Sequence, residues 1–236
     1  MSFKSERIGQ IEVWTGDPDS DAAYAAMVAH LSTTTHPRLP PGEALTNNHL
    51  GNLGEAFAFL VGRSGRFPSA THRLLADNCA NPLAGGSKTG LDVLWIAFHP
   101  TDETLDHAWI QEVKTTRDES EATYIAELKK DYEKLFAARP GLTLEARLGD
   151  AAFRLEHTAD EPDLARRARA LGARSIAEAK RVSLVPTGVH DLAAEAYTVM
   201  EDVRVTLIEL GWDESAVQPL LISLAALSNR LDQITH

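Results

Sequence analysis

Two stretches of strand length decide this fold: Lys88-Thr89-Gly90-Leu91-Asp92-Val93-Leu94-Trp95-Ile96-Ala97-Phe98 and Trp109-Ile110-Gln111-Glu112-Val113-Lys114-Thr115-Thr116. Both contain apolar runs, and a polar connection joins them, as expected of two neighbouring strands. Side chains alternate between faces along a strand, so Glu112 and Lys114 should share one face, about 7 Å apart, with Val113 on the other. Asp92 adds a carboxylate near the start of the first strand. Two acids and an ammonium so placed suit metal-assisted hydrolysis.

A helix is predicted before these strands, from Leu45 to about Val61. Its apolar residues recur at steps of three and four, which marks one buried face: Leu50, Leu53, Phe57, Leu60 and Val61. Glu55 lies at the flank of that face, either as an ordinary solvent-facing residue or as a carboxylate directed into a cleft. Gly51 and Gly54 each cost about 1 kcal/mol relative to Ala in a helix. We expect these small residues to let the helix approach a sheet or a ligand closely.

The segment before this helix is expected to form an opening strand over residues 6–15 and a helix over residues 20–31, with a Pro- and Thr-rich loop at 33–42. Residues 71–77 form either a short strand or a turn of helix. The loop that follows contains Gly85-Gly86-Ser87-Lys88-Thr89-Gly90, which lacks the spacing of a nucleotide-binding phosphate loop. Lys88 and nearby backbone N–H groups can still approach a phosphodiester.

The C-terminal half is expected to be mostly helical. A long helix over residues 119–139 should pack across the sheet, and residues 143–155 are ambiguous. A strand starting at Val182 should stop at Pro186, because proline cannot donate to a sheet ladder. Leucine-rich periodicity then predicts helices at about 190–210 and 215–234.

Residues 163–181 form the one locally basic run of an acidic chain. Its basic residues are Arg166, Arg167, Arg169, Arg174, Lys180 and Arg181. Such a run is either a solvated helix face or a surface that contacts phosphates or a partner protein. We therefore expect substrate contacts, if this run makes them, from the first four of these arginines and from Lys88.

Composition indicates a globular protein. The chain has 236 residues, 44% of them hydrophobic, which suffices to bury a core in one domain. We expect an N-terminal segment over 1–44, a core over 45–140 and a C-terminal elaboration over 141–236. No apolar run reaches the roughly 18 residues of a membrane span, and the first residues do not resemble a signal peptide. Cys79 is the only cysteine, which excludes an internal disulfide and a Cys-based zinc cluster and favours a cytoplasmic location.

A net charge of -11 argues against a protein that wraps nucleic acid with its whole surface, since phosphate binding relies on clustered Lys and Arg. A local basic face, a second subunit or a partner protein would then supply part of the grip. No histidine pair has H-E-x-x-H spacing, which argues against a zinc hydrolase.

In order along the chain, a helix with Glu55, a strand with Asp92 and a strand with Glu112 and Lys114 precede a crossing helix. Over residues 45–140 this order resembles the PD-(D/E)XK nuclease superfamily. The resemblance implies a restriction-endonuclease-like α/β fold, in which a central mixed sheet is flanked by helices and followed here by a C-terminal helical extension. Leu91 stands where the motif has proline.

By this resemblance, Asp92 and Glu112 match metal ligands, Glu55 matches the helix carboxylate that completes the metal site, and Lys114 matches the motif lysine. Mg²⁺, or Mn²⁺ in its place, suits carboxylate oxygens and would neutralise phosphate charge, while Lys114 would orient the attacking water or stabilise developing charge. Carboxylates that converge without a metal repel one another, so at least one should have a raised pKa.

Within the superfamily, Gly90-Leu91-Asp92 and Glu112-Val113-Lys114-Thr115-Thr116 resemble the nuclease components of bacterial antiviral systems, most closely the Hachiman effector nucleases, which act with a helicase. The resemblance implies a DNA-cleaving anti-phage effector with a helicase or ATPase partner. Two alternatives stay open: a catalytically silent binding or regulatory subunit of the same fold, and a restriction endonuclease that cuts DNA as a homodimer.

Overall fold

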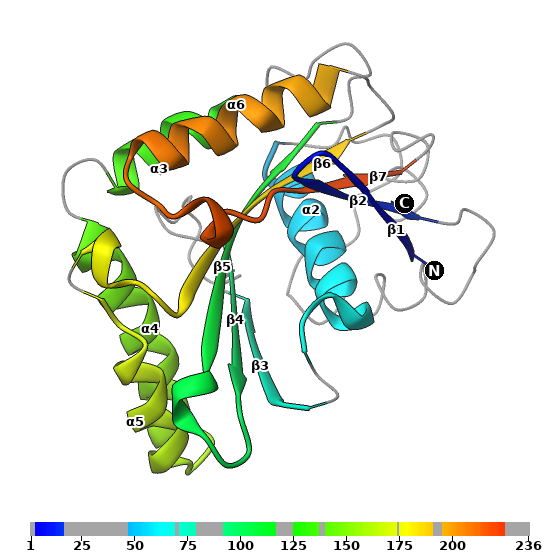
Figure 1. Cartoon of the computed structure of the whole chain (residues 1–236). Helices are drawn as coiled ribbons and strands as arrows, with labels where there is room; N and C mark the ends of the chain where they lie inside the picture. Colours follow the sequence, from blue (N-terminus) through cyan, green and yellow to red (C-terminus); the bar gives the residue numbers. More distant parts are fainter. Residues whose placement is uncertain are drawn as a thin grey trace.

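The computed structural model describes most of the chain, namely residues 3–16, 47–68, 71–78, 92–116, 125–136, 140–173, 175–190 and 195–224. Within these ranges the chain forms a seven-stranded mixed sheet flanked by five α-helices, as Figure 1 shows. The expected α/β architecture, a central mixed sheet with flanking helices, is confirmed. None of the helices in the described ranges is long and apolar enough to cross a bilayer.

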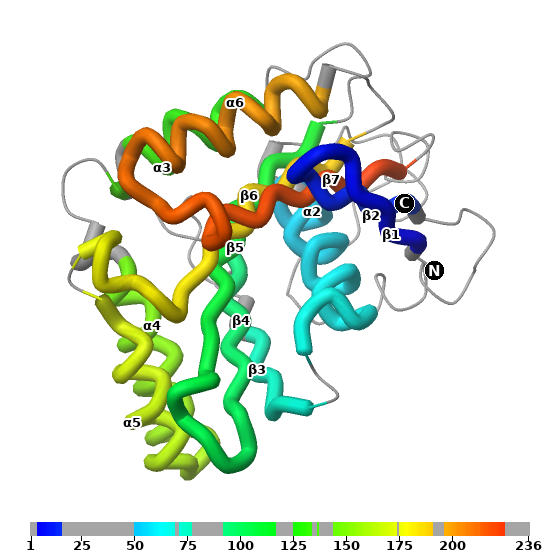
Figure 2. Tube along the Cα trace, in the orientation of Figure 1, coloured from blue at the N-terminus to red at the C-terminus, as the bar shows by residue number. Residues whose placement is uncertain are grey.

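The sheet has the strand order β1-β2-β7-β6-β5-β4-β3. Its strands are β1 (Phe3–Ile8), β2 (Ile11–Gly16), β3 (Arg73–Asn78), β4 (Val93–Phe98), β5 (His107–Thr115), β6 (Val182–His190) and β7 (Leu220–Ser223). The central strands β2, β7, β6 and β5 are parallel, while β1, β4 and β3 extend the sheet with antiparallel pairs. Figure 2 shows the result in colour, since blue β2 lies beside red β7 although they are far apart in sequence.

The helices are α2 (Asn47–Val61), α3 (Glu127–Phe136), α4 (Pro140–His157), α5 (Pro162–Ala170) and α6 (Glu195–Glu209). The predicted helix over 45–61 is confirmed as α2. The predicted helix over 119–139 corresponds to α3 within the described residues, and the ambiguous stretch 143–155 belongs to α4. A proline is well tolerated in the first turn of a helix, which fits the start of α4 at Pro140.

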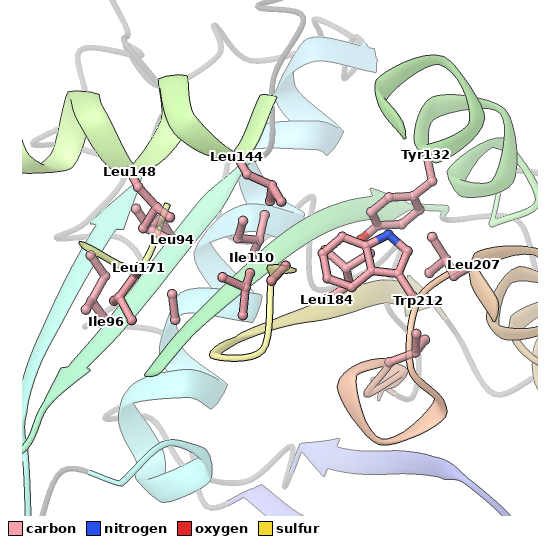
Figure 3. Close-up of a cluster of buried hydrophobic side chains, with 14 of the residues drawn as sticks. Leu94, Ile96, Ile110, Tyr132, Leu144, Leu148, Leu171, Leu184, Leu207 and Trp212 are labelled. Carbon is pink, nitrogen blue, oxygen red and sulfur yellow. The ribbon is translucent and has the colours of Figure 1, made fainter. Parts of the chain in front are cut away.

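The two faces of the sheet are buried by different helices. On one face, α2 packs with Leu53 and Phe57 against β5, β6 and β7. On the other face, α3, α4, α5 and α6 cover a larger apolar cluster, part of which Figure 3 shows around Ile110 and Tyr132. Because both faces are covered, β4, β6 and β7 are buried at every residue and lack polar alternation.

Three expectations about the sheet are wrong, two of them for segments near the ends of the chain. Residues 6–15 are not one strand, because Gly9, with a φ of 59°, forms a tight turn that makes β1 and β2 a hairpin. The expected helix over 215–234 is instead β7 in its described part, since a short apolar run buried on both sides does not show whether it is helix or strand. Residues 71–77, left open between strand and helix, contribute to β3.

The third correction concerns Pro186, where β6 was expected to stop. β6 continues to His190, and its ladder with β7 is interrupted between the bridge Leu184–Val217 and the pair Thr187–Leu220. The missing proline N–H falls within this interruption. The strand therefore tolerates the proline in the middle of the sheet.

The sheet draws on all three segments expected from the sequence. β1 and β2 come from residues 1–44, β3, β4 and β5 from 45–140, and β6 and β7 from 141–236. The C-terminal segment thus provides two central strands as well as helices. The predicted helix over residues 20–31 and the loops at 33–42 and 79–90 lie outside the described residues.

Candidate metal and catalytic site

The sheet narrows where β4 begins. β5 pairs with β4 only as far as the rung Val93–Gln111, whereas on its other side it stays paired with β6 through Thr115. The next position of β5 on the β4 side is occupied by a side chain, because an Asp92 carboxylate oxygen accepts a hydrogen bond from Val113 N–H at 2.8 Å. Asp92 thus ends the β4–β5 ladder and is held at the gap in the sheet.

Glu112 and Lys114 lie on the sheet face covered by α3, as strand alternation predicts. Lys114 Nζ is 3.8 Å from Glu112 Oε1, and Val113 points to the opposite face, where it packs in the apolar cluster of α2. Lys114 Nζ also forms a shorter ion pair, 2.7 Å, with Asp131 Oδ2 of α3. Buried residues of α3, Leu128 and Tyr132, fix this helix over the sheet.

Glu55 reaches the site from the opposite face, on α2. The helix lies so close to β5 that a Cβ on Gly54 would be 1.6 Å from Thr115 Oγ1. The expectation that a small residue allows a close approach is confirmed for Gly54, whereas Gly51 has no atom within 4 Å of such a Cβ. Gly54 therefore sets how near its neighbour Glu55 comes to the end of β5.

The three predicted metal-ligand carboxyls share one electrostatic environment. The pKa of Glu55 is raised to about 8, mainly by burial and also by the charge of Asp92, while the charge of Lys114 opposes the rise. Burial raises the pKa of Asp92 to about 6. Burial also raises the pKa of Glu112 well above its usual value, reinforced by the charges of Asp92, Asp131 and Glu55. The raised carboxyl pKa expected from sequence is thus found at all three acids.

Lys114 counters part of this negative charge. Burial by itself would lower the pKa of Lys114, but its hydrogen bond with Asp131 and the charges of Glu112, Asp131 and Asp92 raise the pKa above its usual value. The ammonium therefore stays protonated through the neutral range. One lysine faces four carboxyls, and the cluster keeps an excess of negative charge.

The donor set fits a hard divalent cation. Three buried oxygens, Glu55 Oε2, Glu112 Oε2 and Thr115 Oγ1, make no hydrogen bond to any described residue, so each has a lone pair that the described residues do not use. Oxygen ligands are those that Mg²⁺ prefers. In the described ranges no three His, Cys, Asp or Glu side chains form a ready metal-binding group as they stand. The acids thus raise one another's pKa, but their oxygens do not meet at one point.

The three described arginines predicted to contact substrate, Arg166, Arg167 and Arg169, are not brought to this site. Arg166 pairs with Glu103 and Asp163, Arg169 pairs with Glu156, and α5 packs near the β4–β5 connection, away from the C-terminal end of β5. Lys88 and Arg174 lie outside the described residues.

Arg167 is a structural residue. It is buried, its Nε donates to Asp106 Oδ2 at 2.8 Å, and its NH2 donates to the backbone carbonyl of His99. This ion pair holds α5 to the loop between β4 and β5. The guanidinium of Arg167 is thus already bound by Asp106 and His99, and contact with a phosphate stays a prediction for Arg167 as for Arg166 and Arg169.

Sequence reasoning missed two features of α3. Asp131 lies three residues after Leu128 and four before Leu135, within the apolar stripe of the helix, and an acid at such a position is a signal that could have been used. Lys129 and Lys130 are exposed beside Asp131, and no ion pair involves them among the described residues. Among the side chains of α3 that the structure describes, they are the two basic ones.

Comparison with known proteins adds no family: no protein-family model matches this sequence, and no curated protein matches it either.

Gly54→Ala should destabilise the protein by about 1–3 kcal/mol, because the added methyl group overlaps Thr115 and must push α2 off β5. Gly51→Ala in the same helix meets open space and should be neutral or stabilising by up to about 1 kcal/mol. Urea unfolding of both variants measures the difference. Equal effects would show that α2 does not approach β5 this closely.

The metal-free protein should lose stability through Glu55 as pH rises. Between its usual value of 4.5 and about 8, the native state keeps a proton that the unfolded state has released, so the free energy of unfolding falls with pH. Glu55→Gln should therefore gain stability relative to the wild type between pH 5 and 8, at up to about 1.4 kcal/mol per pH unit. Urea unfolding in EDTA at several pH values measures this gain.

The control for the pH experiment is Glu133→Gln, which replaces an exposed glutamate of α3. Its stability should follow the wild type at every pH. A Glu55→Gln curve parallel to the wild type would show that Glu55 is not held in the cluster of acids.

Proposed function

We propose that this protein is a Mg²⁺-dependent nuclease that hydrolyses DNA phosphodiester bonds at the gap between β4 and β5. The observation that carries the proposal is that polar groups from both faces of the sheet act on one another electrostatically where the β4–β5 ladder ends. Asp92, Glu112 and Glu55 each have a raised pKa, and Lys114 lies 3.8 Å from Glu112. This set matches the four positions on which the resemblance to PD-(D/E)XK nucleases rests.

Each side chain has a distinct part in the proposed reaction. Asp92, Glu112 and Glu55 would hold the ion through carboxylate oxygens, and Asp92 keeps its orientation because Val113 N–H binds one of its oxygens. When bound, Mg²⁺ supplies positive charge that polarises the phosphodiester and assists deprotonation of the attacking water. Lys114 would donate a hydrogen bond to that water or to the phosphate oxygens on which charge develops.

Among the described residues, exposed basic side chains without an acidic partner are found on α3, the helix that contacts Lys114, and not on α5. Lys129 and Lys130 directly precede Asp131 in the sequence of α3, the helix that contacts Lys114, whereas the described arginines of α5 are paired with carboxylates. An arginine already neutralised by an acid adds little attraction for a phosphate. We therefore propose that Lys129 and Lys130 contact the DNA backbone.

We also propose that the protein acts as an anti-phage effector together with a helicase or ATPase partner. The short motifs around Asp92 and Glu112 support this proposal through their resemblance to Hachiman effector nucleases. The net charge of -11 fits a nuclease that holds DNA weakly by itself. A helicase gene beside this gene would support the defence role, and a methyltransferase gene would support a homodimeric restriction endonuclease.

Purified protein should cleave DNA with Mg²⁺ or Mn²⁺ but not with EDTA. Glu112→Ala and Lys114→Ala should each lower the rate by about 100-fold or more, since each removes a group that acts on the transition state. Lys114→Met should lose activity more than it loses metal-induced thermal stabilisation. Supercoiled, linear and single-stranded DNA and RNA are the substrates, tested alone and with a helicase partner.

The controls for cleavage are Glu133→Ala and Lys180→Ala, which remove exposed charges of the same kind outside the cluster. Both should retain wild-type rates. No metal-dependent cleavage of any substrate would support a silent binding or regulatory subunit instead, and full activity in both site variants would refute the assigned residues.

The pair Lys129→Ala/Lys130→Ala should weaken DNA binding by about fivefold or more, and should reduce the slope of log affinity against log salt by about 1–2. The pair Arg166→Ala/Arg169→Ala removes the same charge and should leave both quantities near wild type. Fluorescence anisotropy in the inactive Glu112→Ala background measures them. The reverse result would assign the DNA contact to α5.

A further inference from the structure

Lys114 has two carboxylate partners of different kinds. Asp131 on α3 forms the short ion pair, 2.7 Å to Nζ, while Glu112 on β5 is 3.8 Å from the same nitrogen. The Lys114 side chain is only 19% exposed and that of Glu112 only 8%, so solvent screens neither strongly. The ammonium is thus closer to a carboxylate of α3 than to the carboxylate on its own strand.

Without Asp131, the remaining ion-pair partner of this ammonium among the described residues would be Glu112. A partly buried ammonium that loses its partner is costly, so it moves to another anion within reach. Lys114 is on the same strand face as Glu112 and needs to close a gap of only about an ångström to form a hydrogen-bonded ion pair. Glu112 Oε1 would then accept a hydrogen bond from the Lys114 ammonium.

Glu112 is also one of the proposed metal ligands. A lysine ammonium and a divalent cation compete for the same carboxylate oxygens, since both are held there by opposite charge. An anion that holds the lysine a short distance aside keeps those oxygens available while leaving the ammonium close enough to act on a phosphate. Asp131 has this position.

We propose that Asp131 is a positioning residue that holds the Lys114 ammonium off Glu112 and so keeps the carboxylates free to bind a divalent cation. This inference rests on the proposed metal-dependent function. It assigns a role to α3, whose buried face at Leu128 and Tyr132 fixes Asp131 over β5.

The test is Mn²⁺ binding, measured by isothermal titration calorimetry on the full chain. Asp131→Asn should weaken Mn²⁺ binding about fivefold or more, because Lys114 then occupies Glu112. In the Lys114→Met background the same Asp131→Asn change should alter affinity less than about twofold, since no ammonium remains to compete. Asp131→Glu, which retains the ion pair, should bind Mn²⁺ nearly as well as the wild type.

The control is Glu133→Gln, which removes an exposed charge of the same helix and should not change Mn²⁺ affinity. If Asp131→Asn does not fold, Asp131→Ser removes the same carboxylate with a smaller side chain and takes its place. An equal loss of affinity with and without Lys114 would mean that Asp131 binds the ion or supports the fold, and would overturn the positioning role.

The two proposals fail differently. Wild-type protein that binds no Mn²⁺ would overturn the metal site and this inference with it. Wild-type protein that binds Mn²⁺ while Asp131→Asn binds it equally well would overturn only the role of Asp131.

Discussion

The hydrogen bond from Val113 N–H to the Asp92 carboxylate determines the geometry of the site, because it forms where β4 stops pairing with β5. A continued strand would satisfy the backbone of β5 with a carbonyl and would separate the two faces of the sheet. A side-chain carboxylate satisfies the same donor and ends the described pairing of the two strands. At this end of the ladder, the acids of α2 on one face and of β5 on the other act on one another electrostatically.

The cost of this arrangement is electrostatic. Glu55, Asp92 and Glu112 are drawn out of water near one another, and the pKa of each rises because burial and like charge both disfavour the ionised form. Lys114 offsets only part of that cost, since Asp131 holds it. Raised carboxyl pKa values of this kind are typical of functional sites, and a bound cation would neutralise the negative charge of these acids. It is also why the unused oxygens of Glu55 and Glu112 support a metal proposal.

The described basic side chains fall into two groups, those paired with acids and those exposed without an acidic partner. Arg167 joins α5 to the β4–β5 connection through the buried Asp106, and Arg166 and Arg169 are neutralised by nearby acids. In an acidic chain, the cations that can attract phosphate are those without an acidic partner, and Lys129 and Lys130 of α3 have none within the described part of the chain. Counting basic residues in the sequence therefore locates the basic run at residues 163–181, but it does not show which basic side chains are exposed and lack an acidic partner.

The sequence by itself determined what depends on local periodicity. Alternation placed Glu112 and Lys114 on one strand face, the steps of three and four set the extent of α2, and a glycine beside Glu55 indicated the close approach of helix and sheet. These predictions succeed because backbone geometry repeats every 2 or 3.6 residues whatever surrounds it. Periodicity does not show that Asp92 and Glu55 are partners in one site. That prediction comes from the resemblance to a nuclease family.

Only the tertiary structure decided what depends on pairing between distant segments. Leu220–Ser223 is a strand because β2 and β6 flank it, and β6 passes through Pro186 because its missing donor falls where the ladder with β7 is interrupted. Asp131 joins the site only because α3 packs over β5. Such contacts are set by which surfaces meet in the folded core, and no local pattern of residues records them.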